Sequence, residues 1–230
     1  MKEIQRKDLI FRNQNKNITS VLISIPTPPF GSLYNGLVKF LLNSRYYPNL
    51  DIQIDIIEHK WPVVRNLQFK RFLELTDSEY LLTIDSDIIP PTNALRMVKE
   101  AKEKQLDYLS AVCFSFQFNE PFAVVMKKDP KGRDGYIQAI PQGKPGIYEV
   151  DATGLACVVL SRRLVNEFQG TFKDKIDSKG MLERDADFDF CERIKKVGYK
   201  VYIDTRVICD HMKVLPLKRI NDLLVKNNDR

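Results

Sequence analysis

Between residues 18 and 104 the chain alternates short apolar runs, rich in β-branched residues, with segments of helical periodicity. The pattern predicts strands over 21–25, 51–57 and 80–87, and helices over 32–43, 64–75 and 92–104. Strands that alternate with helices in this way form a mostly parallel sheet with helices packed on it. Ligands bind such sheets outside the carboxyl ends of the strands, so the residues that follow each strand are the first candidates for a site.

The second half of the chain has a different pattern. A strand over 107–116 is followed by hairpin-like segments rich in Gly, Pro and Lys, and a helix over 185–198 then leads to a strand pair that ends at His211. We therefore predict an α/β fold with a mostly parallel central sheet flanked by helices, and a smaller β-hairpin portion in the second half. The polar segment 170–184 is a candidate lid over a bound ligand.

Length and composition indicate one globular domain. The chain has 230 residues, of which 43% are hydrophobic, and these values are ordinary for a single domain over 1–230 with a polar lead-in at 1–17 and a basic tail at 213–230. The net charge of +6 favours phosphate-bearing ligands or an anionic membrane surface. Nucleic acid is not an expected partner, because the aromatic residues are not interleaved with a basic patch.

The cysteines and the hydropathy pattern bear on the compartment. All four cysteines lie in or near apolar runs and none forms a Cys-x-x-Cys pair, so we expect buried free thiols in a reducing compartment. The N-terminus shows no apolar signal region, and no apolar stretch approaches 18 residues. These features predict a cytoplasmic protein whose only membrane contact is peripheral, through the basic tail.

Two aspartates follow the apolar run 80–84, in the sequence LTIDSDIIPP. Asp85 and Asp87 would repel each other unless a positive charge neutralises them. Mg²⁺ or Mn²⁺ prefers such carboxylates and could also hold a diphosphate. The alternative is that the two aspartates only cap the next helix or satisfy a loop.

The same stretch resembles the Asp-x-Asp motif of GT-A glycosyltransferases, particularly the family-2-like enzymes. Three further segments resemble that family in the same order along the chain: VLISIPT, PVVRNLQFKRFLELTDSEYLLTIDSD and DADFDFCERIKKVGYKVYIDTRVICDH. Together they cover about residues 18–212. The resemblance implies a GT-A fold, a nucleoside-diphosphate-sugar donor carrying UDP or GDP, an acceptor hydroxyl on an unidentified saccharide, protein or lipid, and Mn²⁺ or Mg²⁺ as cofactor.

The resemblance also implies roles for individual residues. Asp87 would bind the metal directly, Asp85 would hold the ribose or contact the metal through water, and His211 would be the third protein ligand. The implied donor-binding residues are Pro26, Thr27, Arg65, Asn66, Asp85, Ser86, Asp87 and Gly154. Gly154 would let a sugar approach the backbone.

The acidic helix supplies the candidate catalytic base. The family pattern Glu-Asp-x-Asp-Phe-Cys-x-Arg places Asp187 at the catalytic position, but Ala186 stands where the pattern has Glu. Asp185 is therefore a substitute candidate. A base at this place would take the proton of the acceptor hydroxyl in a single displacement with inversion. Retention of configuration stays open, since the sequence does not show where the acceptor lies. The alternative is that these acids only stabilise the helix N-terminus.

Two other functions stay open. A sugar nucleotidyltransferase would use the same kind of fold and metal, but the loop PTPPFGSLYNG after the first strand lacks the expected Gly-rich basic pattern. A binding module without turnover is suggested by the missing Glu beside Asp187. Motifs for dinucleotide, P-loop or serine-hydrolase chemistry do not occur.

Overall fold

The computed structural model describes residues 18–213, except 30, 118–119, 130, 132–134, 177 and 179–181. The polar lead-in, all but the first residue of the basic tail, and part of the candidate lid therefore lie outside the described residues. Among the residues that the structure describes, no helix has the length and apolar character needed to cross a membrane.

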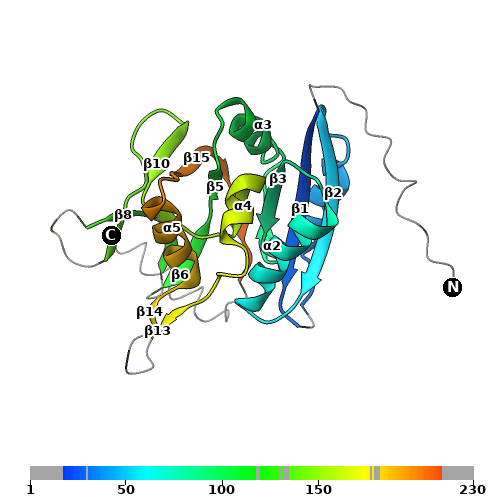
Figure 1. Ribbon diagram of the computed structural model, residues 1–230. Coiled ribbons are helices and arrows are strands. Elements are labelled where there is room, and N and C mark those ends of the chain that lie inside the picture. Colours follow the sequence, from blue (N-terminus) through cyan, green and yellow to red (C-terminus); the bar gives the residue numbers. More distant parts are fainter. Residues whose placement is uncertain are drawn as a thin grey trace, which may run out of the picture.

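A seven-stranded sheet forms the centre of the molecule (Figure 1). Its strands, in spatial order, are β10 (Ile147–Val150), β15 (Val201–Ile208), β5 (Tyr108–Val112), β12 (Cys157–Ser161), β3 (Tyr80–Ile84), β1 (Thr19–Thr27) and β2 (Leu50–Glu58). The pairs β1–β2, β1–β3 and β5–β15 are parallel, whereas β12 is antiparallel to both of its neighbours and β10 is antiparallel to β15. The sheet is therefore mixed, and the prediction of a mostly parallel sheet is not confirmed.

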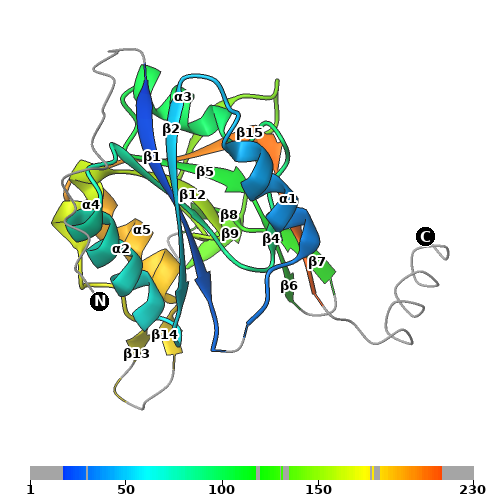
Figure 2. The same ribbon diagram turned by 90° about the vertical axis from the view of Figure 1, so that its right-hand side faces the viewer.

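Helices cover both faces of this sheet (Figure 2). One face packs against α2 (Val63–Leu75), α4 (Arg162–Phe168) and α5 (Ala186–Lys196), and the other against α1 (Asn35–Ser44) and α3 (Arg96–Glu103). Each layer has its own hydrophobic core. Burial on both faces is why the strands read as nearly continuous apolar runs rather than as alternating ones.

Successive side chains of β1 point to opposite faces of the sheet, so this strand contributes to both cores. Val21, Ile23 and Ile25 are fully buried and belong to the core beneath α1 and α3. Leu22 belongs to the opposite core, and Ser24 on that face accepts a hydrogen bond from Gln68 of α2. The hydroxyl of Ser24 thus replaces an apolar group where a polar helix residue is buried against the sheet.

Small antiparallel sheets of two or three strands complete the described fold. They are β4 (Ile88–Ile89) with β16 (Asp210–His211), β6 (Phe114–Gln117) with β7 (Glu120–Ala123), β8 (Val125–Lys128) with β9 (Tyr136–Gln138) and β11 (Ala152–Thr153), and β13 (Lys175–Ile176) with β14 (Leu182–Arg184). The hairpin portion predicted for the second half is therefore present, although β10 joins the central sheet. The candidate lid contains β13 and β14.

The ends of α5 agree with the prediction from the sequence, whereas the start of α3 does not. The Asp185 carboxylate accepts a hydrogen bond of 2.9 Å from the N–H of Asp187 at the start of α5, and Gly198 has φ of +97° just after its end. The helix α3 begins only at Arg96, and no side chain caps it. The predicted start at residue 92 is wrong, because 92–95 form a turn first and the Asn93 side chain donates to the carbonyl of Arg206.

All four cysteines are free and buried, as the sequence predicts.

Replacing Phe190 by Ala should strongly destabilise the fold. Its fully buried ring lies 5.4 Å from that of Phe172, 5.7 Å from that of Phe168 and 5.8 Å from that of Phe69, measured between centroids. Removing it leaves a cavity, and we expect the free energy of unfolding to fall by about 3–5 kcal/mol in urea titrations. Val197→Ala, just after α5 and 56% exposed, should change it by less than about 0.5 kcal/mol. Equal urea midpoints for the two variants would contradict this packing.

Candidate functional site

A pocket of about 360 Å³ opens where β1, β2 and β3 end. Its walls come from the end of β1, the connection between β2 and α2, and the turn after β3. Pro26 and Thr27, predicted to line a nucleotide site, are both buried in this wall, and Trp61, which is 44% exposed, lines the same pocket as the Asp85–Asp87 turn. Three segments distant in sequence meet here because parallel strands end at the same edge of a sheet.

Two larger pockets, of about 440 and 400 Å³, lie elsewhere. The larger one lies at the amino ends of β5 and β15, where its charged groups pair with one another, as Arg163 does with Asp107 at 2.5 Å. Neither contains a residue that the sequence singles out. The smaller pocket of about 360 Å³ is therefore the candidate site, on the chemistry of its lining rather than on its size.

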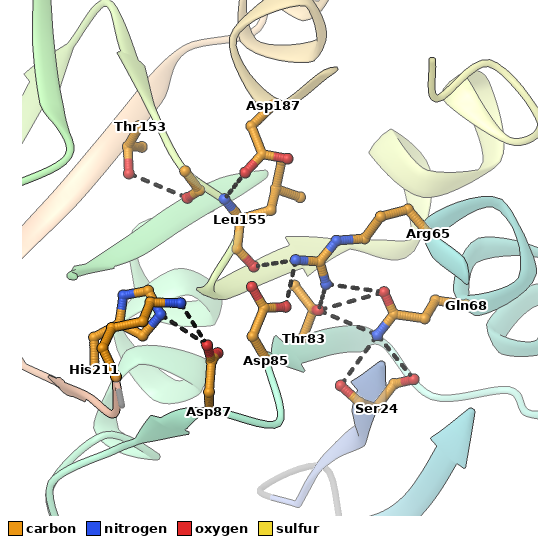
Figure 3. A network of polar contacts seen from close by, with 12 residues as sticks. Ser24, Arg65, Gln68, Thr83, Asp85, Asp87, Thr153, Leu155, Asp187 and His211 are labelled. Atoms are coloured by element: carbon orange, nitrogen blue, oxygen red, sulfur yellow. Dashed lines mark hydrogen bonds and ion pairs between the residues drawn. The ribbon is translucent and has the colours of Figure 1, made fainter. Parts of the chain in front are cut away.

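A fully buried arginine supports this pocket from beneath (Figure 3). Arg65 donates to the Asp85 carboxylate at 2.6 Å and to the Leu155 carbonyl at 3.1 Å. The Trp61 ring covers its guanidinium, with 4.6 Å from Cζ to the ring centroid. A buried charge is tolerated only when it is paired and hydrogen-bonded, so these contacts hold the carboxylate and the loop of Leu155 in place.

The same arginine is part of a buried polar row between α2 and the sheet. It donates to Gln68 and Thr83, and Gln68 donates to Ser24 and Thr83 at 3.1 Å. Ser24 and Thr83 are register partners in the parallel pair β1–β3, so their hydroxyls lie side by side. Sequence reasoning missed this row, although hydroxyl residues within two otherwise apolar strands are its visible signal.

Arg65 and Asn66 do not sit as predicted. Arg65 presents no surface to a ligand. Asn66 donates to the carbonyl of Phe172 and accepts from its N–H, both at 2.9 Å. Its amide therefore anchors the segment after α4. Both side chains are thus engaged within the protein, and their predicted contact with the nucleotide stays a prediction.

The two aspartates of the turn have different partners. Burial raises the pKa of Asp85 above its usual value, with Asp87 adding to the effect and the Arg65 guanidinium opposing it. Burial alone would also raise the pKa of Asp87, but hydrogen bonds from His211 and Lys213 outweigh it and lower that pKa to about 2. Asp87 is therefore a carboxylate at neutral pH, facing outward beside Ser86 in the pocket wall.

The short pair β4–β16 carries His211 to Asp87. Ile88 pairs with His211, and the N–H of Met212 donates to the Asp87 carbonyl at 2.8 Å. His211 Nδ1 contacts the Phe114 carbonyl, which can only accept, so Nδ1 carries a hydrogen. Nε2 then faces Asp87 Oδ2 at 2.9 Å. The hydrogen bond with Asp87 raises the pKa of His211.

The Asp87–His211 pair fits two ligands of one cation. Neighbouring ligands about 2.1 Å from an octahedral ion are about 3 Å apart, close to the observed Oδ2–Nε2 separation. Asp85, predicted to hold the ribose or to contact the metal through water, does not join this pair, since its Oδ1 is bound to Arg65. Within the described part of the chain, no group of three His, Cys, Asp or Glu side chains is arranged to hold a metal. Direct contact with one cation is therefore open to Asp87 and His211, and the indirect role of Asp85 stays a prediction.

Asp187 lies on the other side of the Leu155 peptide from Asp85 (Figure 3). The N–H of Leu155 donates to Asp187 Oδ2 at 2.8 Å, while Oδ1 is buried without a hydrogen-bond partner among the described residues. Burial raises the pKa of Asp187 to about 7, against the opposing charge of Arg65. A carboxyl group that titrates near neutral pH, with one free oxygen, has the properties of a general base.

Two further candidates are placed near Asp187. Asp185 is exposed and its carboxylate caps α5, which agrees with the helix-end interpretation. A Cβ at Gly154 would lie 3.5 Å from Asp187 Oδ2, an ordinary contact, so the protein itself does not require glycine there. Their roles as substitute base and as sugar-approach residue stay predictions.

No protein-family model matches the sequence, and a search of curated proteins found no match. Solved structures do share the fold. The "Crystal Structure of A197 from STIV" matches with TM-score 0.60 and 19% identity, over 85% of this chain and 87% of that one. The "Crystal structure of GalNAc-T7 with UDP, GalNAc and Mn2+" matches with TM-score 0.51 and 10% identity, over 87% of this chain but 45% of that one. At these identities the likeness shows the α/β fold alone.

Arg65→Met should destabilise the protein far more than Arg71→Met on the same helix. Removing the buried guanidinium leaves Asp85 and the Leu155 carbonyl unpaired, and we expect a loss of about 3 kcal/mol in the free energy of unfolding. Arg71 is 43% exposed and pairs with Asp55, so its loss should cost less than about 1 kcal/mol. Urea unfolding of both variants checks this, and a small effect of Arg65→Met would refute the supporting role.

Proposed function

We propose that this chain is a metal-dependent glycosyltransferase, which moves a sugar from a nucleoside-diphosphate-sugar to an acceptor hydroxyl. The observation that carries the proposal is the Asp87–His211 pair beside a pocket at the carboxyl edge of the sheet. The fold is shared with a protein whose structure contains UDP, GalNAc and Mn²⁺. On this reading the fold is of the GT-A type, in a single domain that acts in the cytoplasm or at a membrane surface reached by the basic tail.

The pocket suits the nucleotide part of a donor. Its volume of about 360 Å³ falls in the range of small-molecule sites. Pro26 and Thr27 give it a buried wall, and the half-exposed Trp61 ring offers a flat face for a base or ribose. Arg65 holds one oxygen of Asp85, which leaves the other oxygen able to accept a ribose hydroxyl. Ser86 lies between the two carboxylates, where its hydroxyl can reach the donor.

Asp87 and His211 would hold the cation, with the donor diphosphate and water as its remaining ligands. When bound, Mn²⁺ or Mg²⁺ compensates the charge that develops on the departing nucleoside diphosphate. The imidazole ligand favours Mn²⁺ over Mg²⁺, because nitrogen is a softer donor than carboxylate oxygen. The protein fixes the imidazole beforehand through the contact of Nδ1 with the Phe114 carbonyl.

Asp187 would act as the base. Its Oδ2 is held by the N–H of Leu155, so Oδ1 is the oxygen that can accept the proton of an acceptor hydroxyl. The hydroxyl oxygen attacks the anomeric carbon as the bond to the diphosphate breaks, in a single displacement with inversion. A binding module without turnover is the alternative that the missing Glu at Ala186 favours, and loss of activity in an Asp187 variant separates the two.

Nucleotide binding should raise the melting temperature only when Mn²⁺ is present. At about 100 times its dissociation constant a ligand adds about 2.7 kcal/mol, which corresponds to about 5–10 °C for a chain of this length. We expect UDP or GDP with Mn²⁺ to give this shift and Asp87→Ala to abolish it. Asp51→Ala, which removes an exposed acid on β2, should keep it. The metal assignment fails if either nucleotide stabilises the wild type and Asp87→Ala equally without Mn²⁺.

Turnover should depend on the ionisation of Asp187. Because its pKa is raised to about 7, the active carboxylate is depleted below that pH, and kcat/KM should rise tenfold per pH unit up to about pH 7 and then level off. The assay follows nucleoside diphosphate release from the sugar nucleotide that gives the largest thermal shift.

Asp187→Asn should lower kcat/KM by about 10²–10⁴-fold. Asp185→Asn serves as the matched control, since asparagine caps a helix as well as aspartate does and the rate should be nearly unchanged. Equal losses in the two variants would remove Asp187 from the role of base.

A further inference from the structure

Lys213 lies at the proposed metal site without being one of its predicted ligands. It follows β16 by two residues, and its Nζ is 2.7 Å from Asp87 Oδ2. This is the same oxygen that faces His211 Nε2 at 2.9 Å. The Lys213 side chain is 45% exposed and that of Asp87 33%. A half-exposed cationic side chain therefore contacts the oxygen proposed to hold the metal.

The surroundings explain why a positive charge is needed there. His211 uses its Nδ1–H on the Phe114 carbonyl, so it can bind a metal through Nε2 only when the proton that Nε2 donates to Asp87 has left. The deprotonated Nε2 and the carboxylate oxygen are then both acceptors, and they repel each other unless a cation lies beside them. Arg65 cannot serve, because its guanidinium is bound to Asp85 and the Leu155 carbonyl. In the described part of the chain, Lys213 is the ammonium that contacts Asp87.

We propose that Lys213 is a built-in counter-ion of the metal site, which a divalent cation must displace from Asp87 in order to bind. The inference rests on the proposed function, since it takes Asp87 and His211 as metal ligands. An ammonium in contact with a divalent ion's carboxylate ligand weakens that ion's binding through like-charge repulsion. The half-exposed lysine leaves toward solvent at little cost, so the competition is reversible.

The test measures Mn²⁺ binding to the full chain without nucleotide, from the electron paramagnetic resonance signal of free Mn²⁺. Lys213→Met removes the charge and keeps the length of the side chain, and we expect it to bind Mn²⁺ at least about fivefold more tightly than the wild type. Lys213→Arg retains the charge and should bind like the wild type. Lys200→Met makes the same charge change at a residue 59% exposed and paired with Glu149, before the amino end of β15, and should also bind like the wild type.

Asp87→Ala separates this inference from the function on which it rests. If Asp87→Ala loses Mn²⁺ binding while Lys213→Met binds no more tightly than the wild type, the metal site stands and the counter-ion role is overturned. A gain in Lys200→Met equal to that in Lys213→Met would also overturn it, since net charge would then explain both. If Asp87→Ala binds Mn²⁺ like the wild type, the metal assignment itself fails and the inference fails with it.

Discussion

Burial of the Arg65 guanidinium is the constraint around which the site is organised. A fully buried cation needs several acceptors, and they come from three directions: Gln68 on its own helix, Thr83 and Asp85 on and after β3, and the Leu155 carbonyl from the loop before β12. These contacts join α2, the central sheet and a segment 90 residues further along the chain. The position of one carboxylate in the pocket therefore depends on a charge that never reaches solvent.

The Asp-x-Asp turn divides its two charges between separate partners. Asp85 is neutralised from inside the protein by Arg65, whereas Asp87 meets His211 and Lys213 from the side of the pocket. Two like charges so close together would otherwise be unfavourable. The arrangement gives one carboxylate a fixed orientation and leaves the other with partners that an incoming ligand can replace. In the proposed function, this division would separate the positioning of a donor from the holding of a cation.

Sequence patterns predict the elements of this fold better than its contacts. The apolar runs give β1, β2 and β3 within a few residues, and the acids of the turn stand out because carboxylates rarely follow buried strands without a reason. The direction of β12 could not be predicted, since a run such as CVVLS reads the same in a parallel or an antiparallel place. The contact of Asn66 with Phe172 could not be predicted, because Phe172 lies 106 residues away and contributes only backbone. The contact of Lys213 with Asp87 could not be predicted either, because it depends on the pairing of β4 with β16.

β12 is antiparallel to its neighbours β3 and β5, so β12 begins at the edge of the sheet where β3 and β5 end. The residues before β12 therefore cross the site as main chain, and the Leu155 peptide contacts Asp187 through its N–H and Arg65 through its C=O. Side-chain identity matters little to either bond, apart from the exclusion of proline, which has no N–H to donate. Two descendants of a common ancestor could thus preserve this link while differing at every position from 154 to 156. An alignment of their sequences would give no sign that it exists.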